Sequence, residues 1–184
     1  QKARRMPPEL YFISRHASGA NLKVRDDLLD IKLKTGETPE GYEIFQPSGK
    51  LKFPLAPADL ATLFGHLKVP PPPSGTGGSL QEVVAMARAH PDIVPVSVEK
   101  MRYGFTVGGV ICEYARVWFN GARVDTACCE SEDYASLKKV IELLGIAADA
   151  YWEIDEKYRL VAGTVQRAGG PSLGATDGLG AVPW

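Results

Sequence analysis

NLKVRDDLLDIKLK, residues 21–34, is the stretch of sequence that decides the fold. Successive side chains of a β-strand point to opposite faces of the sheet, so residues two apart share a face. Read with this period, the stretch predicts two strands with a basic face, whose cations are Lys23, Arg25, Lys32 and Lys34. Asp30 shares that face, whereas Leu29, Ile31 and Leu33 point the other way. The aspartates at 26–27 allow a tight turn, so we predict a hairpin with one basic and one apolar face.

A second segment, VSVEKMRY at residues 96–103, repeats this pattern. Lys100 and Arg102 share a strand face there with Val96 and Val98. Like charges placed side by side cost energy unless water or an anion separates them. Two interpretations therefore stay open. One is an antiparallel sheet with a solvated outer face, which is the commoner outcome, and the other is a surface that binds an anion.

Composition and charge limit the class of protein and the kind of partner. The chain has 184 residues, of which 45% are hydrophobic and 23% charged, which is enough for one domain with a sizeable core. The formal net charge is -1 and the pI is about 6.4, so total charge favours neither nucleic acid nor an anionic membrane as partner. Any anion site must therefore be local. No run of about 18 apolar residues occurs, and we expect no membrane-spanning helix.

Cysteine usage indicates the redox compartment. The three cysteines are Cys112, Cys128 and Cys129, an odd count that includes two adjacent residues. This pattern favours reduced thiols, and hence a cytoplasmic location, over a disulfide framework. The three histidines lie far apart and show no metal-ligand spacing. The basic start at residues 2–5 is not followed by the apolar core of a signal peptide, so we expect Gln1 to be a trimmed or processed end.

Periodicity places the remaining elements. Alternating or β-branched segments predict further strands at 9–14, 42–46, 94–107, 110–119 and 122–132. Apolar residues at helical spacing predict helices at 57–67, 79–90 and 133–144. The short turns between strands favour antiparallel pairing. The proline-rich segment 68–79 is interpreted as a linker, and a docking role for a proline-recognition domain ranks below that.

These elements predict an α+β fold. We expect a single domain over residues 1–165, made of two similar halves joined near 68–79, followed by a Gly-rich tail at 166–184. If the strands close into an antiparallel β-barrel of about eight strands, with helices packed outside, the basic faces can line a water-filled tunnel. We then expect six cations to converge on one cavity: Lys23, Arg25, Lys32, Lys34, Lys100 and Arg102.

A cationic tunnel of this kind suits a chain of phosphates. Arg forks and Lys point charges are the groups that bind phosphate oxygens. Carboxylates on the same lumen can hold Mg²⁺ or Mn²⁺, since hard cations prefer oxygen ligands; the candidates are Glu9, Glu43, Glu113 and Glu130. A metal ion beside such cations makes cleavage of a phosphoanhydride chemically plausible.

The order of these motifs over residues 9–160 resembles the CYTH, or triphosphate tunnel metalloenzyme, family. The resemblance rests on NLKVR, on LDIKLK, on Lys100-x-Arg102 and on CCESED followed by a helix. It implies an eight-stranded antiparallel tunnel and metal-dependent hydrolysis or cyclisation of triphosphates. Members of the family act on inorganic triphosphate, thiamine triphosphate, nucleoside triphosphates or polyphosphate.

The chain departs from the family signature at the implied metal ligands. The family's Glu-x-Glu-x-Lys on the first strand is Glu9-Leu-Tyr11-Phe-Ile13 here, and its late Glu-x-Glu is Cys128-Cys129-Glu130. The metal ligands that remain from the resemblance are Glu9 and Glu130, and Glu113, Glu132 or Glu43 are the residues that can compensate for the lost ones. We expect the metal at Glu9, Glu130 and Glu113. The sequence identifies no catalytic residue.

Three functions follow from these observations. The first is a divalent-metal-dependent, triphosphatase-like phosphohydrolase. The second is a non-catalytic module that binds triphosphate or polyphosphate anions, and the third is a domain with ordinary basic faces that contacts another protein. The missing carboxylates favour the second, because Lys and Arg alone bind a phosphoanhydride without supplying most of the rate of its cleavage. We expect tight, salt-sensitive binding of triphosphate-like anions and weak or absent hydrolysis.

Overall fold

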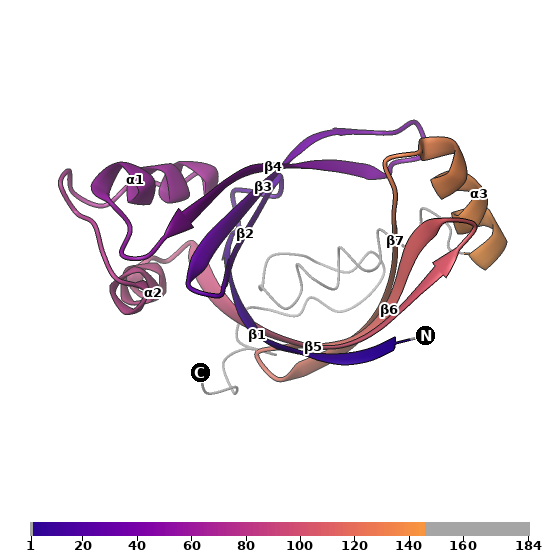
Figure 1. Cartoon of the computed structure of the whole chain (residues 1–184). Coiled ribbons are helices and arrows are strands. Elements are labelled where there is room, and N and C mark those ends of the chain that lie inside the picture. The colour runs from indigo at the N-terminus through magenta and orange to yellow at the C-terminus, as the bar shows by residue number, and fades with distance from the viewer. Residues whose placement is uncertain (1, 146–184) are drawn as a thin grey trace, which may run out of the picture. The chain divides into compact units, whose positions relative to one another are not determined.

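The structure is a computed structural model that describes residues 2–145 (Figure 1). These residues divide between two compact units. The first unit is Glu9–Ser97, and the second consists of the residues up to Pro8 together with those from Val98 onward. The Gly-rich tail predicted at 166–184, and the end of the predicted domain at 146–165, lie outside the described residues. The prediction of a single domain over 1–165 stays a prediction.

Seven strands and three helices form the described part of the chain, which confirms the α+β class. The strands are β1 (Lys2–Ser14), β2 (Ala20–Arg25), β3 (Leu28–Glu37), β4 (Glu43–Lys52), β5 (Ile93–Val107), β6 (Val110–Phe119) and β7 (Ala122–Glu130). The helices are α1 (Pro57–His66), α2 (Leu80–Ala89) and α3 (Tyr134–Leu144). No helix within residues 2–145 is long and apolar enough to cross a membrane.

The hydrogen-bonded strand order is β4-β3-β2-β1-β5-β6-β7. Antiparallel pairing, as predicted, is found in every strand pair with an assigned register: β1–β2, β2–β3, β3–β4, β5–β6 and β6–β7. Within residues 2–145 this order ends at β4 and at β7, so these seven strands do not close into a barrel. The antiparallel sheet is therefore confirmed for the described part of the chain, whereas a tunnel of about eight strands stays a prediction.

The two faces predicted for residues 21–34 are confirmed in the first unit. The apolar side chains of β2 and β3 are buried and belong to one core, to which α1 and α2 also contribute; its members include Leu22, Val24, Leu29, Ile31, Leu60, Leu63, Phe64 and Val83. Figure 1 shows both helices beside these strands. Full burial of such a side chain stabilises the fold by about 1.5–3 kcal/mol. The basic face is consequently the one that turns away from this core.

Two helices of the first unit begin and end close to their predicted limits. The Ser79 hydroxyl accepts a hydrogen bond from the Glu82 N–H, and the Glu82 carboxylate accepts one from the Ser79 N–H at 2.7 Å. This capping box satisfies donors at the start of α2 that would otherwise lack a partner. The proline-rich segment 68–79 lies between α1 and α2, within the first unit.

Three strand boundaries differ from the predicted ones. The strand predicted at 42–46 continues through Pro47 to Lys52 as β4. Proline is tolerated there because β4 is an end strand, and the register shifts where Lys32 lies opposite Pro47. β1 starts at Lys2, ahead of the predicted residue 9. β7 ends at Glu130, so Glu132 lies beyond the strand on which it was predicted.

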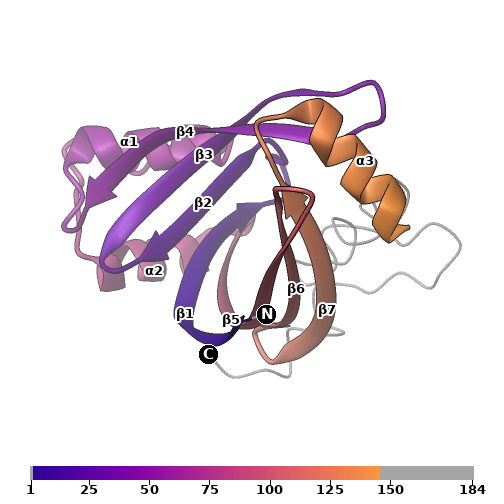
Figure 2. The ribbon, with the colours of Figure 1, turned by 45° about the vertical axis from the view of Figure 1, so that its right-hand side comes forward.

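The second unit has a smaller core between β5–β7 and α3. Val110, Cys112 and Val140 are buried together, and Phe105 and Leu137 pack against them. Figure 2 shows α3 beside β6 and β7. The Asp133 carboxylate accepts hydrogen bonds from the first N–H groups of α3, and Gly145, with a φ of 66°, ends the helix as predicted. The opposite face of these strands is therefore not covered by α3.

We predict that Asp27→Gly stabilises the first unit. Asp26 and Asp27 form the turn between β2 and β3 with φ of 52° and 57°, a left-handed conformation that glycine adopts with less strain. The free energy of unfolding should rise by about 0.5–1 kcal/mol, measured by urea denaturation. The reverse substitution, Gly121→Asp, serves as the counterpart at the turn between β6 and β7, where φ is 89°. It should lower the stability of the second unit. A loss of stability in Asp27→Gly would contradict this account of the turn.

Candidate functional site

The first unit places most of the predicted cations on one sheet face, which we call the polar face. Strand register puts Tyr11 opposite Lys23, Lys23 opposite Asp30 and Asn21 opposite Lys32. The polar face comprises Glu9, Tyr11, Asn21, Lys23, Arg25, Asp30, Lys32, Lys34 and Lys50. Four of the six predicted cations thus lie together, on the face opposite the core.

Glu9 is a buried carboxylate on the β1 part of this face, and only 5% of it is exposed. Its Oε2 accepts a hydrogen bond from the Tyr11 hydroxyl at 3.0 Å. Its Oε1 lies 3.5 Å from the Lys23 Nζ and 3.5 Å from a guanidinium nitrogen of Arg25. Arg25 is also 3.8 Å from the Asp30 carboxylate. Both oxygens of Glu9 are therefore occupied by protein donors, and the cations around it are partly neutralised.

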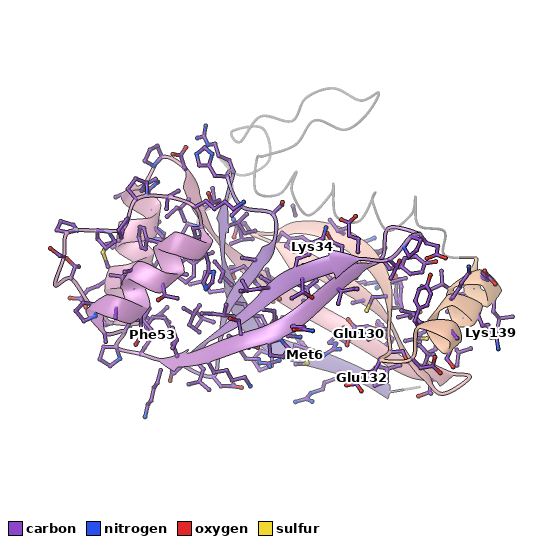
Figure 3. All side chains as sticks on the ribbon, turned by 90° about the horizontal axis from the view of Figure 1, so that it is seen from above. Met6, Lys34, Phe53, Glu130, Glu132 and Lys139 are labelled. Carbon is purple, nitrogen blue, oxygen red and sulfur yellow. The ribbon has the colours of Figure 1, made fainter. Side chains whose placement is uncertain are left out.

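Lys34 is held by two carboxylates from the same unit. Its Nζ lies 2.7 Å from the Glu43 Oε1 and also donates to Glu37 (Figure 3 labels Lys34). Partial burial lowers the pKa of Lys34, but the hydrogen bonds that Lys34 donates to Glu37 and Glu43 outweigh it and raise this pKa above its usual value. Lys34 therefore stays charged at neutral pH, and its charge is compensated.

Lys32 differs from Lys23, Arg25 and Lys34, the other predicted cations of the polar face, which are paired with carboxylates. Within residues 2–145 it makes no ion pair or hydrogen bond through its side chain, and it lies opposite Asn21 on β2 and Pro47 on β4. The Oδ1 atom of Asn21 is buried and also has no hydrogen-bond partner in this part of the chain. An uncompensated cation thus lies beside a polar group with unused hydrogen-bonding capacity.

The second unit carries the other two predicted cations on one face of β5–β7. Register places Lys100, Arg102, Glu113, Cys128 and Glu130 on this face, opposite the α3 side. The Arg102 guanidinium donates to the Glu113 carboxylate through Nε and pairs with it through a second nitrogen. Burial lowers the pKa of Arg102, but the Glu113 carboxylate outweighs this effect, so the pKa of Arg102 is raised above its usual value. Glu113 is therefore engaged as a counter-ion.

Cys128 lies directly opposite Glu113 on the neighbouring strand. Burial, with smaller contributions from Glu113 and Glu130, raises the pKa of the Cys128 thiol to about 11. Arg102 and Lys100 act in the opposite direction and offset only part of this. Cys128 is consequently a protonated thiol at neutral pH and a poor nucleophile.

The implied metal ligands are distributed between the two units. Glu9 belongs to the first unit, whereas Glu113 and Glu130 are diagonal neighbours on β6 and β7 of the second (Figure 3 labels Glu130 and Glu132). No group of three or more His, Cys, Asp or Glu side chains that could hold a metal occurs among residues 2–145. Cations lie beside both Glu9 and Glu113, and such neighbours do not suit a divalent metal. Mg²⁺ or Mn²⁺ at these residues stays a prediction.

Convergence of all six cations on one cavity also stays a prediction, because Lys100 and Arg102 belong to the second unit. Sequence reasoning named Glu9, Glu43 and Glu113 as possible metal ligands but missed their role as partners of the cations. The two-residue spacing of Glu9 and Tyr11 on one strand shows from the sequence that they share a face. The partners of Arg25 and Lys34 lie on other strands, so they depend on strand register.

Comparison with known protein families, with characterised proteins and with solved structures finds no match to this chain.

We predict that Glu9→Gln destabilises the first unit. The amide keeps the shape of the side chain but leaves Lys23 and Arg25 without their shared counter-ion in a poorly hydrated setting. The free energy of unfolding should fall by about 1–3 kcal/mol in urea denaturation. Glu37→Gln is the matched control, since its more exposed pair with Lys34 should contribute about 1 kcal/mol or less. Equal effects of the two variants would show that the burial of Glu9 has no special role.

We predict that alkylation of Cys128 by iodoacetamide is slow at pH 7 and accelerates until the pH passes about 11. The thiolate is the reactive form, and the folded state disfavours it. For the same reason the thiol contributes stability that is present below the unfolded pKa near 9.0 and is lost as the pH rises toward 11. The Cys129→Ala variant isolates Cys128 for peptide mass spectrometry. A rate that already levels off near pH 9 would contradict the shift.

Proposed function

We propose that the polar face of the first unit binds a multiply charged, elongated anion of the triphosphate or polyphosphate class. The observation that carries the proposal is the placement of Lys32, an uncompensated cation among further cations of the same face. A phosphate group near Lys32 can accept hydrogen bonds from its ammonium group.

The neighbours of Lys32 extend this contact along the sheet. Lys34 follows two residues later on β3, and Lys23 is diagonal to Lys32 on β2. Such neighbours lie about 7 Å apart, so a single phosphate contacts one of them and a chain of phosphates can contact several. The ligand must compete with Glu9 and Glu43 for the paired cations. This competition favours anions with several charges and makes the affinity depend on salt.

Binding without turnover is the function that we propose. The resemblance to the tunnel family implies Mg²⁺ or Mn²⁺ and a closed tunnel in which Lys100 and Arg102 contact the same ligand. Two of the carboxylates implied as metal ligands, Glu9 and Glu113, are paired with cations, and two family carboxylates are replaced by Tyr11 and Cys128. A metal-dependent triphosphatase is therefore the alternative. It predicts turnover that requires an added divalent metal.

We predict that Lys32→Gln weakens binding of tripolyphosphate. Loss of one charged hydrogen bond costs about 1–3 kcal/mol, or a roughly 5- to 150-fold higher Kd at low salt. Isothermal titration calorimetry with tripolyphosphate, pyrophosphate and ATP, each with and without Mg²⁺ or Mn²⁺, measures this. Lys68→Gln is the matched control, because it removes the same charge just after α1, away from the polar face.

Three results would change the proposal. Equal affinity of Lys32→Gln and wild type would move the site away from the polar face. Metal-dependent release of phosphate by the unmodified chain would reinstate the enzyme. No affinity for any of these anions at low salt would leave the protein-contact function.

A further inference from the structure

Cys112 and Cys129 face each other across neighbouring strands of the second unit. They occupy opposite positions of β6 and β7, and their Sγ atoms are 3.4 Å apart. Cys112 is almost fully buried, with 1% exposed, next to Val110 and Val140. Cys129 is half-buried, and Cys128 points to the other face of the sheet. One thiol of the pair is thus reachable from solvent and the other lies directly behind it.

The geometry of this hairpin suits a covalent bond between the two sulfurs. The turn between β6 and β7 consists of Asn120 and Gly121, both with positive φ, and Phe119 pairs with Ala122 across it. The pair that flanks a two-residue turn is hydrogen-bonded, and pairs alternate between hydrogen-bonded and non-hydrogen-bonded from there. The register has no shift up to Cys112 and Cys129, so this alternation makes theirs a non-hydrogen-bonded pair.

Non-hydrogen-bonded pairs bring side chains closer than the other kind, with Cα atoms about 4.5 Å apart. Disulfides require Cα separations of about 4.4–6.8 Å, so the strands need little movement to accommodate one. The adjacent residues Cys128 and Cys129 have no such geometry, because they point to opposite faces. The cysteine count predicts reduced thiols, and this agrees with the pair, because the two thiols stay reduced until an oxidant is present.

We propose that Cys112 and Cys129 form a reversible cross-strand disulfide when a low-molecular-weight disulfide supplies the oxidising equivalents. The Cys129 thiolate attacks one sulfur of the small disulfide, forms a mixed disulfide and releases one small thiol. Cys112 then loses its proton and attacks the Cys129 sulfur, which releases the second small thiol. The two protein thiols lose two electrons and two protons, and the small disulfide takes these up to become two thiols.

The bond would act on the part of the second unit that α3 covers. Cys112 and Cys129 belong to the core in which Val140 and Leu137 of α3 pack. A crosslink between β6 and β7 restricts the unfolded chain and therefore stabilises this core. Burial raises the pKa of the Cys129 thiol to about 12, so little thiolate exists at neutral pH and the bond forms slowly without an added oxidant.

The test uses the full chain, a hydroxyethyl disulfide oxidant and mass spectrometry of the intact and digested protein. The wild type should lose two hydrogen atoms, show a peptide crosslink between Cys112 and Cys129, and retain one alkylatable thiol. Its Tm should rise and return to the starting value after addition of dithiothreitol. The Cys128→Ala variant should form the same crosslink, whereas Cys129→Ala should form no intramolecular disulfide and show no rise in Tm.

Several results would overturn the proposal. These are three alkylatable thiols after oxidation of the wild type, a crosslink that contains Cys128, or oxidation that yields only disulfides between two chains. Because the Cys128→Ala variant and the wild type keep both proposed partners, a folding defect in Cys129→Ala does not decide the outcome.

Discussion

The buried carboxylate of Glu9, held between Lys23 and Arg25, sets the chemistry of the polar face. Removing an isolated charge from water costs many kcal/mol, so such a group is found buried only with compensating partners. Tyr11, Lys23 and Arg25 supply them from β1 and β2. Strand alternation makes this arrangement possible, because the same strands send Leu22 and Val24 into the core on the other side. One carboxylate thereby fixes two cations in place and reduces their capacity to bind an external anion.

The second unit repeats this principle with different residues. Arg102 is paired with Glu113, and Cys128 lies beside them as a protonated thiol. In each unit a cation predicted to bind phosphate forms an ion pair with a carboxylate predicted to bind metal: Arg25 with Glu9 and Arg102 with Glu113. The pairing is the reason why we propose binding rather than hydrolysis, since a carboxylate that neutralises Arg102 is not available to hold a divalent metal. Lys32 carries the proposal because none of the described carboxylates pairs with it.

Local patterns in the sequence predicted most of the fold. The alternation of residues 21–34 gave the correct faces, and the capping box at Ser79 and the glycine at 145 marked helix ends. β4 was predicted too short, because proline interrupts an inner strand but not an end strand. Closure of the sheet depends on pairing between distant strands, and no local pattern encodes it.

The candidate site was predictable only in part for the same reason. Phase within a strand shows which residues share a face, and this correctly grouped Lys23, Arg25, Lys32 and Lys34. Which charges become partners depends on the register between strands, which brings Lys34 to Glu43 and Arg102 to Glu113. The closeness of Cys112 and Cys129 has the same origin, because they are 17 residues apart in sequence and opposite each other in the sheet.

The central claim is that the polar face of the first unit is an anion-binding surface built around Lys32. The most direct measurement is a titration of the isotopically labelled chain with tripolyphosphate, followed by amide chemical shifts in two-dimensional NMR. The account predicts saturable shifts concentrated in residues 21–34, with little change in α3. Shifts absent at low salt, or spread evenly over the strands and helices of both units, would contradict it.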